Sequence, residues 1–130
     1  MCRLTFTRPD DLHLHLRDGV SMASIVSATA RCFARAVIMP NLPVPITTVA
    51  QALAYRKRIL ATIMPTNHFN PLMTLYLTDD TSVNEIAQAK ASEHVIAVKY
   101  YPAGATTHSD NGVTDLRRVW PILEAMQTYD

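Results

Sequence analysis

Two histidines and an arginine, His13, His15 and Arg17, stand at alternate positions near the start of the chain, with leucines between them. A β-strand sends alternate side chains to opposite faces, so a strand over 12–17 places both imidazoles and the guanidinium on one side. Residues two apart in a strand lie roughly 6.6 Å from each other, and inward-leaning imidazoles can each bring a nitrogen to about 2.0–2.1 Å of one zinc ion. The spacing indicates either a zinc-binding pair or the polar face of a half-exposed strand.

The residues that follow this pair favour a site. Asp18 and Gly19 are typical of a turn directly after a strand, so the two histidines stand near the C-terminal end of that strand. Parallel β/α proteins build their sites at this end of the sheet.

The rest of the chain alternates between strand-like and helix-like segments. Apolar runs predict strands over 12–17, 36–39, 72–77 and 95–98. Capping residues and helical periodicity predict helices over 22–33, 48–63, 83–91 and 115–127. Ser82 and Glu85 form a capping box pattern, and Pro121 predicts either a kink or a late start of the fourth helix.

Repeated βα units predict an α/β fold, with a parallel sheet covered by helices. Either a small doubly wound sheet or part of a (β/α)8 barrel fits this pattern. A full barrel needs about 250 residues, and four units in 130 residues make half of one. We expect residues 1–130 to form a partial barrel domain that stops before the fifth strand.

Composition limits the partners. The 12 basic and 11 acidic residues leave a formal net charge of +1, without a long run of either sign. This balance argues against nucleic acid or a membrane surface as a partner and favours a small molecule. The two cysteines, Cys2 and Cys32, form no CxxC pair, and no signal peptide or membrane span is evident. We expect a cytoplasmic protein.

Three further motifs in collinear order carry a family resemblance. They are Arg-Asp-Gly at 17–19, Met-Pro-Asn at 39–41, and Lys-x-Tyr-Pro-Ala-Gly-Ala-Thr-Thr at 99–107. With the His-x-His pair, they resemble the N-terminal signatures of dihydroorotases of the single-function bacterial and fungal type, within the amidohydrolase superfamily. The resemblance implies a TIM-like (β/α)8 metallo-dependent hydrolase barrel. It also implies reversible ring closure of N-carbamoyl-L-aspartate to L-dihydroorotate in pyrimidine nucleotide synthesis.

The resemblance also implies a metal site with two zinc ions. His13 and His15 would bind the more buried ion, and Lys99, carboxylated on its amine, would bridge both. Opening a cyclic amide at neutral pH needs a strong nucleophile, and zinc supplies one by lowering the pKa of bound water to about 7. A lysine that ends a buried strand keeps more of its neutral, reactive amine because desolvation disfavours the ammonium.

Four other residues would contact the substrate by the same resemblance. Arg17 and Asn41 would hold its α-carboxylate, a task that suits the planar fork of arginine. Thr106 and Thr107 would belong to a mobile loop that closes over the substrate, with Gly104 and Gly112 as sources of flexibility. The remaining histidines, at 68, 94 and 108, are expected in solvent.

The family's site needs groups that we expect beyond Asp130: two histidine ligands and the aspartate that acts as general base. We therefore expect no catalytic residue in this chain, negligible activity of the chain alone, and a homodimer when the enzyme is complete. Two alternatives stay open, a non-catalytic half-barrel that binds metal or another chain, and another cyclic amidohydrolase such as a hydantoinase or allantoinase.

Overall fold

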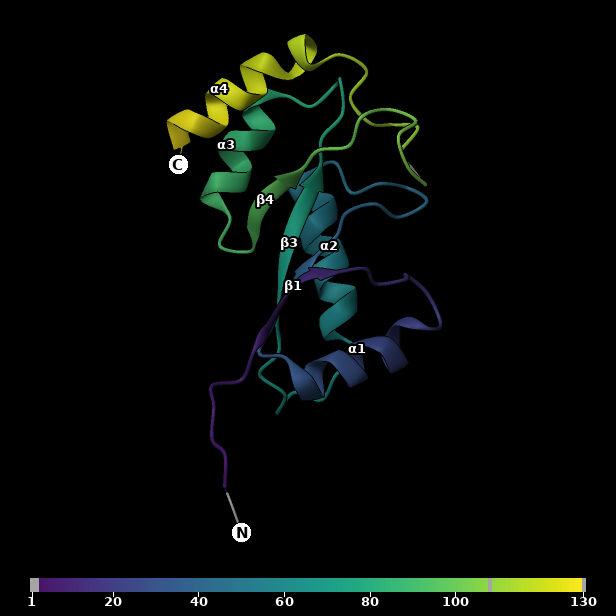
Figure 1. Ribbon diagram of the computed structural model, residues 1–130, viewed down its shortest axis with the longest axis vertical. Coiled ribbons are helices and arrows are strands. Elements are labelled where there is room, and N and C mark those ends of the chain that lie inside the picture. Colours follow the sequence, from purple (N-terminus) through teal and green to yellow (C-terminus); the bar gives the residue numbers. More distant parts are fainter. Residues whose placement is uncertain (1–2, 108, 130) are drawn as a thin grey trace.

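The computed structural model describes residues 3–107 and 109–129, so Cys2 and His108 lie outside the described residues. Four parallel strands form one sheet in the order β1-β2-β3-β4, which is also their order along the chain (Figure 1). Their bounds are β1 Asp10–Leu14, β2 Arg35–Ile38, β3 Asn70–Tyr76 and β4 Val95–Lys99. The predicted α/β class is confirmed, and four successive βα units correspond to one half of a (β/α)8 barrel.

The first strand is shorter at its C-terminal end than the predicted 12–17. Leu14 pairs with Ile38, the last residue of β2, and its carbonyl accepts a hydrogen bond from the Met39 N–H at 2.9 Å. β2 itself ends at Ile38, so β1 has no strand partner beyond Leu14. His15 and Arg17 therefore lie in the segment after β1 and not within it.

The helices follow the predicted positions: the first two are shorter than predicted, the third has the predicted bounds, and the last ends two residues later. They are α1 Met22–Cys32, α2 Val49–Leu60, α3 Val83–Ala91, the 3₁₀ helix η1 Leu116–Val119 and α4 Trp120–Tyr129. The proline at position 121 is the second residue of α4, where its missing N–H breaks no helical hydrogen bond. Of the two outcomes predicted for this proline, the late start is confirmed.

Side-chain caps fix where α2 and α3 begin. Thr48 and Gln51 form a reciprocal capping box, a pattern that the sequence analysis did not identify. Ser82 accepts a hydrogen bond from the Glu85 N–H at 3.2 Å, which is half of the box predicted there. The Glu85 carboxylate instead accepts from the N–H of Val49, the first residue of α2. One carboxylate thus joins the starts of two neighbouring helices.

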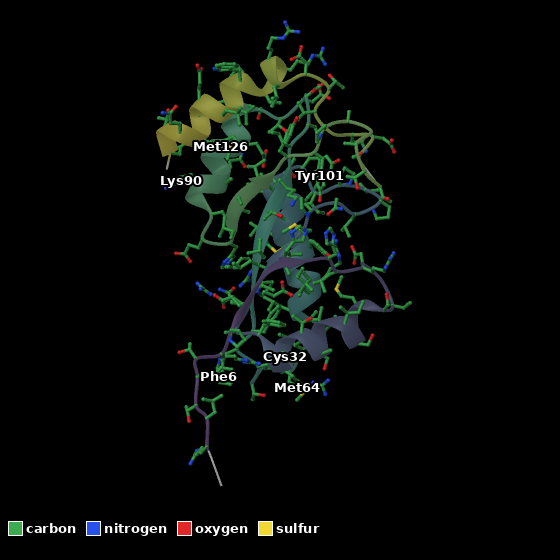
Figure 2. The ribbon with its side chains drawn as sticks, in the orientation of Figure 1. Phe6, Cys32, Met64, Lys90, Tyr101 and Met126 are labelled. Atoms are coloured by element: carbon green, nitrogen blue, oxygen red, sulfur yellow. The ribbon has the colours of Figure 1, made fainter. Side chains whose placement is uncertain are left out.

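Two apolar clusters hold the helices to the sheet. The larger lies between the sheet and helices α1 and α2, and includes the fully buried Val26, Tyr55 and Leu75. The smaller joins α3, η1 and α4 around Ile86 and Val119, and Met126, labelled in Figure 2, packs against it. Within the described residues, every helix is too short or too polar to cross a bilayer.

Candidate functional site

The candidate site residues predicted from the sequence lie at the C-terminal ends of the strands, on one side of the sheet. All of them stand at or just beyond the C-terminal end of a strand, which in a parallel sheet is a common edge. In chain order they are His13, His15, Arg17, Asn41, Lys99, Thr106 and Thr107.

The imidazoles of His13 and His15 face each other. Their Nε2 atoms lie 3.0 Å apart, and their ring centroids are separated by 5.0 Å. Two nitrogens bound to one tetrahedral zinc ion at about 2.0–2.1 Å lie about 3.3 Å from each other. The separation and the imidazole donors therefore fit a shared zinc ion.

The environment of His15 favours the neutral ring that binds metals. Partial burial lowers the pKa of His15, and the nearby positive charges of His13 and Lys99 lower it further. A neutral imidazole has a lone pair free for a metal, whereas a protonated one has none.

Lys99 ends β4 and is half-buried. Its Nζ lies 5.3 Å from the centroid of the Tyr101 ring, which stacks on Tyr76 with a centroid distance of 5.4 Å. Strands β1 and β4 are the two outer strands of the sheet, and three strand spacings in a flat sheet amount to about 14 Å. The positive charge of Lys99 nevertheless lowers the pKa of His15, in the segment after β1, so these two side chains are near enough to interact.

This set contains two histidines and one lysine. Within 3–107 and 109–129, no cluster of three or more His, Cys, Asp or Glu side chains is placed to hold a metal ion. A third ligand from the described residues would therefore have to be of another kind, and the Lys99 amine qualifies only after conversion to an anionic carbamate.

A pocket of about 700 Å³ adjoins the histidine pair. It is lined by His15 and by all four residues expected to contact substrate, Arg17, Asn41, Thr106 and Thr107. Tyr101, labelled in Figure 2, also lines it and was not identified from the sequence. His13 and Lys99 are absent from the lining that the described residues form, so the metal candidates lie beside this pocket, with His15 common to both.

Asn41 lines the pocket and carries an unsatisfied polar atom. Its Oδ1 is buried and finds no hydrogen-bond partner among the residues that the structure describes. A buried acceptor without a partner is costly. Because this oxygen is itself buried, a ligand in the pocket could reach it only after the carboxamide rotates.

The loop after β4 is closed by its own backbone. The N–H of Val113 donates to the carbonyl of Tyr101, and the N–H of Ala103 donates to the carbonyl of Val113, both at 2.9 Å. Between these ends, the Ser109 hydroxyl accepts from the Thr106 N–H at 2.9 Å and donates to the Thr106 carbonyl at 2.5 Å. Ser109 is fully buried, so the turn that bears Thr106 is folded around it.

The two glycines of this loop differ from each other. Gly104 has a φ of +73° in open space, whereas Gly112 is buried, and a Cβ there would lie 2.5 Å from the carbonyl oxygen of Tyr101. We expected both to supply flexibility. Gly112 instead permits two backbone segments to touch, which is a packing requirement.

The base of the loop is tied to the end of β3. The Asp79 carboxylate accepts from the Thr114 N–H at 3.0 Å and from the Thr114 hydroxyl at 2.6 Å, and it pairs with Arg118 at 2.8 Å. The hydrogen bond from Thr114 and the Arg118 guanidinium lower the pKa of Asp79 to about 2. No pattern in the sequence joins residues 35 and 39 positions apart.

The two other histidines that the structure describes, His68 and His94, do not line the pocket. His68 is exposed, as expected, while His94 is half-buried in the turn before β4.

Comparison with known proteins identifies close relatives. The chain is 66% identical over 125 residues to a dihydroorotase of Cupriavidus necator and 62% identical over 130 residues to one of Microcystis aeruginosa. These alignments cover 96% and 100% of this chain, and 36% and 38% of the relatives. The chain thus spans little more than a third of their length. No family model matches it.

Solved structures of dihydroorotases share the fold. The enzyme from Campylobacter jejuni superposes with a TM-score of 0.84 at 38% identity, over 97% of this chain and 39% of that one. The Saccharomyces cerevisiae enzyme, solved with 5-fluoroorotic acid, gives 0.81 at 35% identity, over 93% and 33%. The sequence identity of 62% to 66% along nearly the whole chain, joined to this common fold, shows that the chain belongs to the dihydroorotase family.

Proposed function

We propose that this chain supplies one side of a zinc-dependent dihydroorotase site. The reaction is the reversible closure of N-carbamoyl-L-aspartate to L-dihydroorotate, a step of pyrimidine nucleotide synthesis. The observation that carries the proposal is a convergence: the ends of parallel strands bring a pair of facing imidazoles beside a pocket lined by Arg17, Asn41 and two loop threonines. Kinship with dihydroorotases over the whole chain supports the choice of reaction.

His13 and His15 would hold one zinc ion, and Lys99, as a carbamate, would bridge it to a second. The short distance between the Nε2 atoms and the lowered pKa of His15 support this assignment. Zinc, when bound, polarises the amide carbonyl and activates water at neutral pH.

Arg17 and Asn41 would orient the substrate through its α-carboxylate. A guanidinium forms two parallel hydrogen bonds with a carboxylate, which fixes both position and angle. Thr106 and Thr107 would donate hydroxyl hydrogen bonds from the opposite wall and exclude water. All four side chains line one pocket, so a single small ligand can touch all of them.

The same kinship supports our proposals for the partner and the compartment. The small-molecule substrate is the ligand proposed here, and the complete enzyme is proposed to be a cytoplasmic homodimer.

A chimeric enzyme tests the proposal. In this chimera, the chain replaces the matching 125-residue segment of the Cupriavidus necator dihydroorotase. We expect hydrolysis of dihydroorotate and none of hydantoin. His13→Ala and His15→Ala should each lower zinc content and activity, whereas His68→Ala, an exposed histidine away from the site, should change neither. Preference for hydantoin, or zinc content unaffected by the first two changes, would contradict the proposal.

The isolated chain should be inactive. The resemblance places two histidine ligands and the general base in segments that this sequence does not contain. We expect the purified chain, supplied with zinc and bicarbonate, to hydrolyse dihydroorotate no faster than a buffer control. Turnover that disappears with His13→Ala would show that this half-site is catalytically sufficient.

A further inference from the structure

Arg17 stands between two residues that are held in place, while its own guanidinium is free. The buried side chain of Leu16 belongs to the main apolar cluster, and the Asp18 carboxylate is bound by an arginine of α2. Arg17 itself is exposed, lines the pocket, and makes no hydrogen bond or ion pair with any residue in the described part of the chain. The segment presents this one cation outward.

Two interactions, which we call holds, fix the backbone beside Arg17. The first hold is made by a buried tyrosine of α2. The Tyr55 hydroxyl donates to the backbone carbonyl of Leu16 at 3.3 Å, and the ring is fully buried. The phenol stays protonated because burial raises the pKa of Tyr55. The hydroxyl thereby satisfies a carbonyl that lies beyond the end of β1 and has lost its strand partner.

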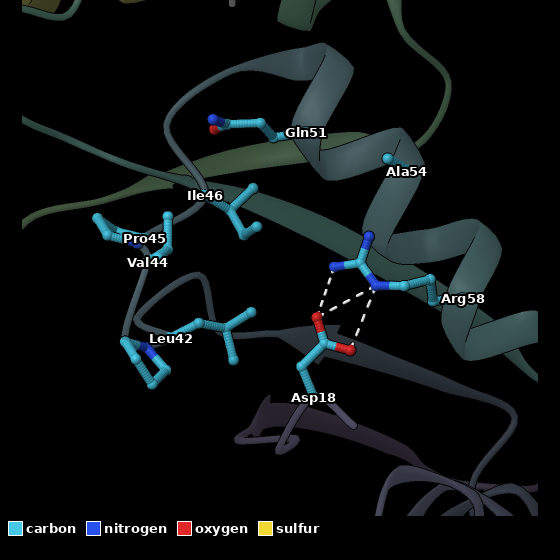
Figure 3. A pocket seen from close by; sticks show the side chains of 9 residues that line it. Asp18, Leu42, Val44, Pro45, Ile46, Gln51, Ala54 and Arg58 are labelled. Carbon is cyan, nitrogen blue, oxygen red and sulfur yellow. Dashed lines mark hydrogen bonds and ion pairs between the residues drawn. The ribbon is translucent and has the colours of Figure 1, made fainter. Parts of the chain in front are cut away.

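The second hold is a forked ion pair one helical turn later. Arg58 donates from Nη2 to Asp18 Oδ2 at 2.6 Å and from Nε to both carboxylate oxygens at 3.1 and 3.2 Å (Figure 3). Its guanidinium carbon lies 5.2 Å from the centroid of the Tyr55 ring. Asp18 also accepts from the Gly19 N–H at 3.0 Å, so the turn into α1 is fixed at the same point.

We propose that Tyr55 and Arg58 are positioning residues that hold the backbone on both sides of Arg17, so that its guanidinium is presented to the carboxylate of the substrate. This inference rests on the proposed function. Residues 55 and 58 lie one turn apart on α2, so both side chains reach the same segment. The two holds act on Leu16 and Asp18, so Arg17 is the single residue between them.

The exposure of the ion pair separates positioning from stability. The side chains of Arg58 and Asp18 are 45% and 37% exposed, and pairs as exposed as this add little to folding stability. Loss of Arg58 should therefore leave the melting temperature nearly unchanged. Its effect should appear in substrate affinity, because small misplacements of a binding group are costly.

The experiment measures dihydroorotate hydrolysis in the chimeric enzyme. Arg58→Met keeps the apolar stem of the side chain and removes its hydrogen bonds, and Tyr55→Phe removes only one hydroxyl. We expect each to raise KM about tenfold while kcat changes less than about twofold. Arg58→Lys, which keeps the charge but not the fork, should give an intermediate KM.

Lys57→Met is the matched control, since it removes a positive charge from an exposed neighbour on the same helix. A double-mutant cycle then tests the route of the effect. In an Arg17→Met background, Arg58→Met should produce no further rise in KM, because the group that it positions is gone. An independent further rise, or equal effects of Arg58→Met and Lys57→Met, would overturn the inference.

A structural measurement keeps this inference distinct from the proposed function. If the chimera does not act on dihydroorotate, the proposed function fails, and amide hydrogen exchange over residues 16–19 still tests the two holds. Faster exchange in Tyr55→Phe and Arg58→Met than in Lys57→Met supports them. Equal exchange in all three variants overturns them.

Discussion

Two segments border the same pocket and are held in opposite ways. The segment 16–19 after β1 is fixed from outside, by the side chains of Tyr55 and Arg58 on α2. The loop 101–113 after β4 is fixed from within, by backbone hydrogen bonds across its base and by the hydroxyl of Ser109 at its tip. Both segments present polar side chains to the same pocket. Only in the loop do the stabilising hydrogen bonds join residues close together in the sequence.

The difference follows from length. A segment of four residues is too short to close a loop around one of its own side chains, so Leu16 and Asp18 take partners from another element. A loop of thirteen residues can close a turn around its own side chain and satisfy its backbone internally, as compact surface loops do. We therefore expect damage to the loop to come from changes within it, and damage to 16–19 to come from a helix about forty residues away.

The largest effect should come from Gly112→Ala. The added Cβ would lie 2.5 Å from the Tyr101 carbonyl oxygen and 2.9 Å from that of Ser109, both of them backbone atoms that hold the loop closed. The loop must open to admit it, and Thr106 and Thr107 move with it. We expect kcat/KM of the chimera for dihydroorotate to fall about a hundredfold.

Gly104→Ala is the matched control for this change, in the same loop. A Cβ there meets nothing within 4 Å among the described residues, and only the φ of +73° opposes it. That conformation costs an alanine about 1 kcal/mol, so the loss of activity should be far smaller. Equal losses in the two variants would mean that backbone strain, and not the close approach, governs the loop.

A smaller effect is expected from Ser109→Ala. The change removes the hydroxyl that both accepts from and donates to the backbone of Thr106, and it leaves the Thr106 N–H without that partner. We expect kcat/KM to fall about tenfold, with faster hydrogen exchange confined to the loop. Ser92→Ala, which removes a serine hydroxyl from the turn before β4, should retain full activity. Faster exchange over 16–19 in Ser109→Ala would break the separation between the two segments.

The order of elements could be predicted from the sequence because its signals are local. Apolar runs, capping residues and prolines lie within a few positions of the boundaries that they set, as with Thr48 at the start of α2 and Pro121 in α4. The end of β1 could not, because it depends on where the neighbouring strand β2 ends. That pairing is visible only once the two strands are aligned.

The same distinction applies to the candidate site: the residues that line the pocket could be predicted from the sequence, and the residues that support them could not. The residues that line the pocket stand at strand ends or in a recognisable motif, so position along the chain suffices to select them. Position along the chain does not select the residues that support them. Tyr55, Arg58 and Asp79 act on residues 35 to 40 positions away. On a helix, Tyr55 and Arg58 are indistinguishable in sequence from a core residue and a solvated cation.

The smallest effect on activity is expected from a change at Asp79. This residue lies outside the loop and binds Thr114 and Arg118 at the base of the loop. Its pKa in the folded chain is about 2, below the ordinary value of 3.8, because Thr114 and Arg118 bind the charged form. The stability that it adds is therefore complete above pH 3.8 and is lost as the pH falls toward 2.

Asp79→Asn should lower kcat/KM only about twofold, because the base of the loop is also closed by backbone hydrogen bonds. Urea unfolding of the chimera and of this variant should show a constant gap in stability from neutral pH down to about pH 4, which narrows at lower pH. A gap that persists undiminished at pH 2 would mean that the carboxylate charge is not what holds the base, and a fall in activity as large as that of Gly112→Ala would mean that the loop depends on outside support after all.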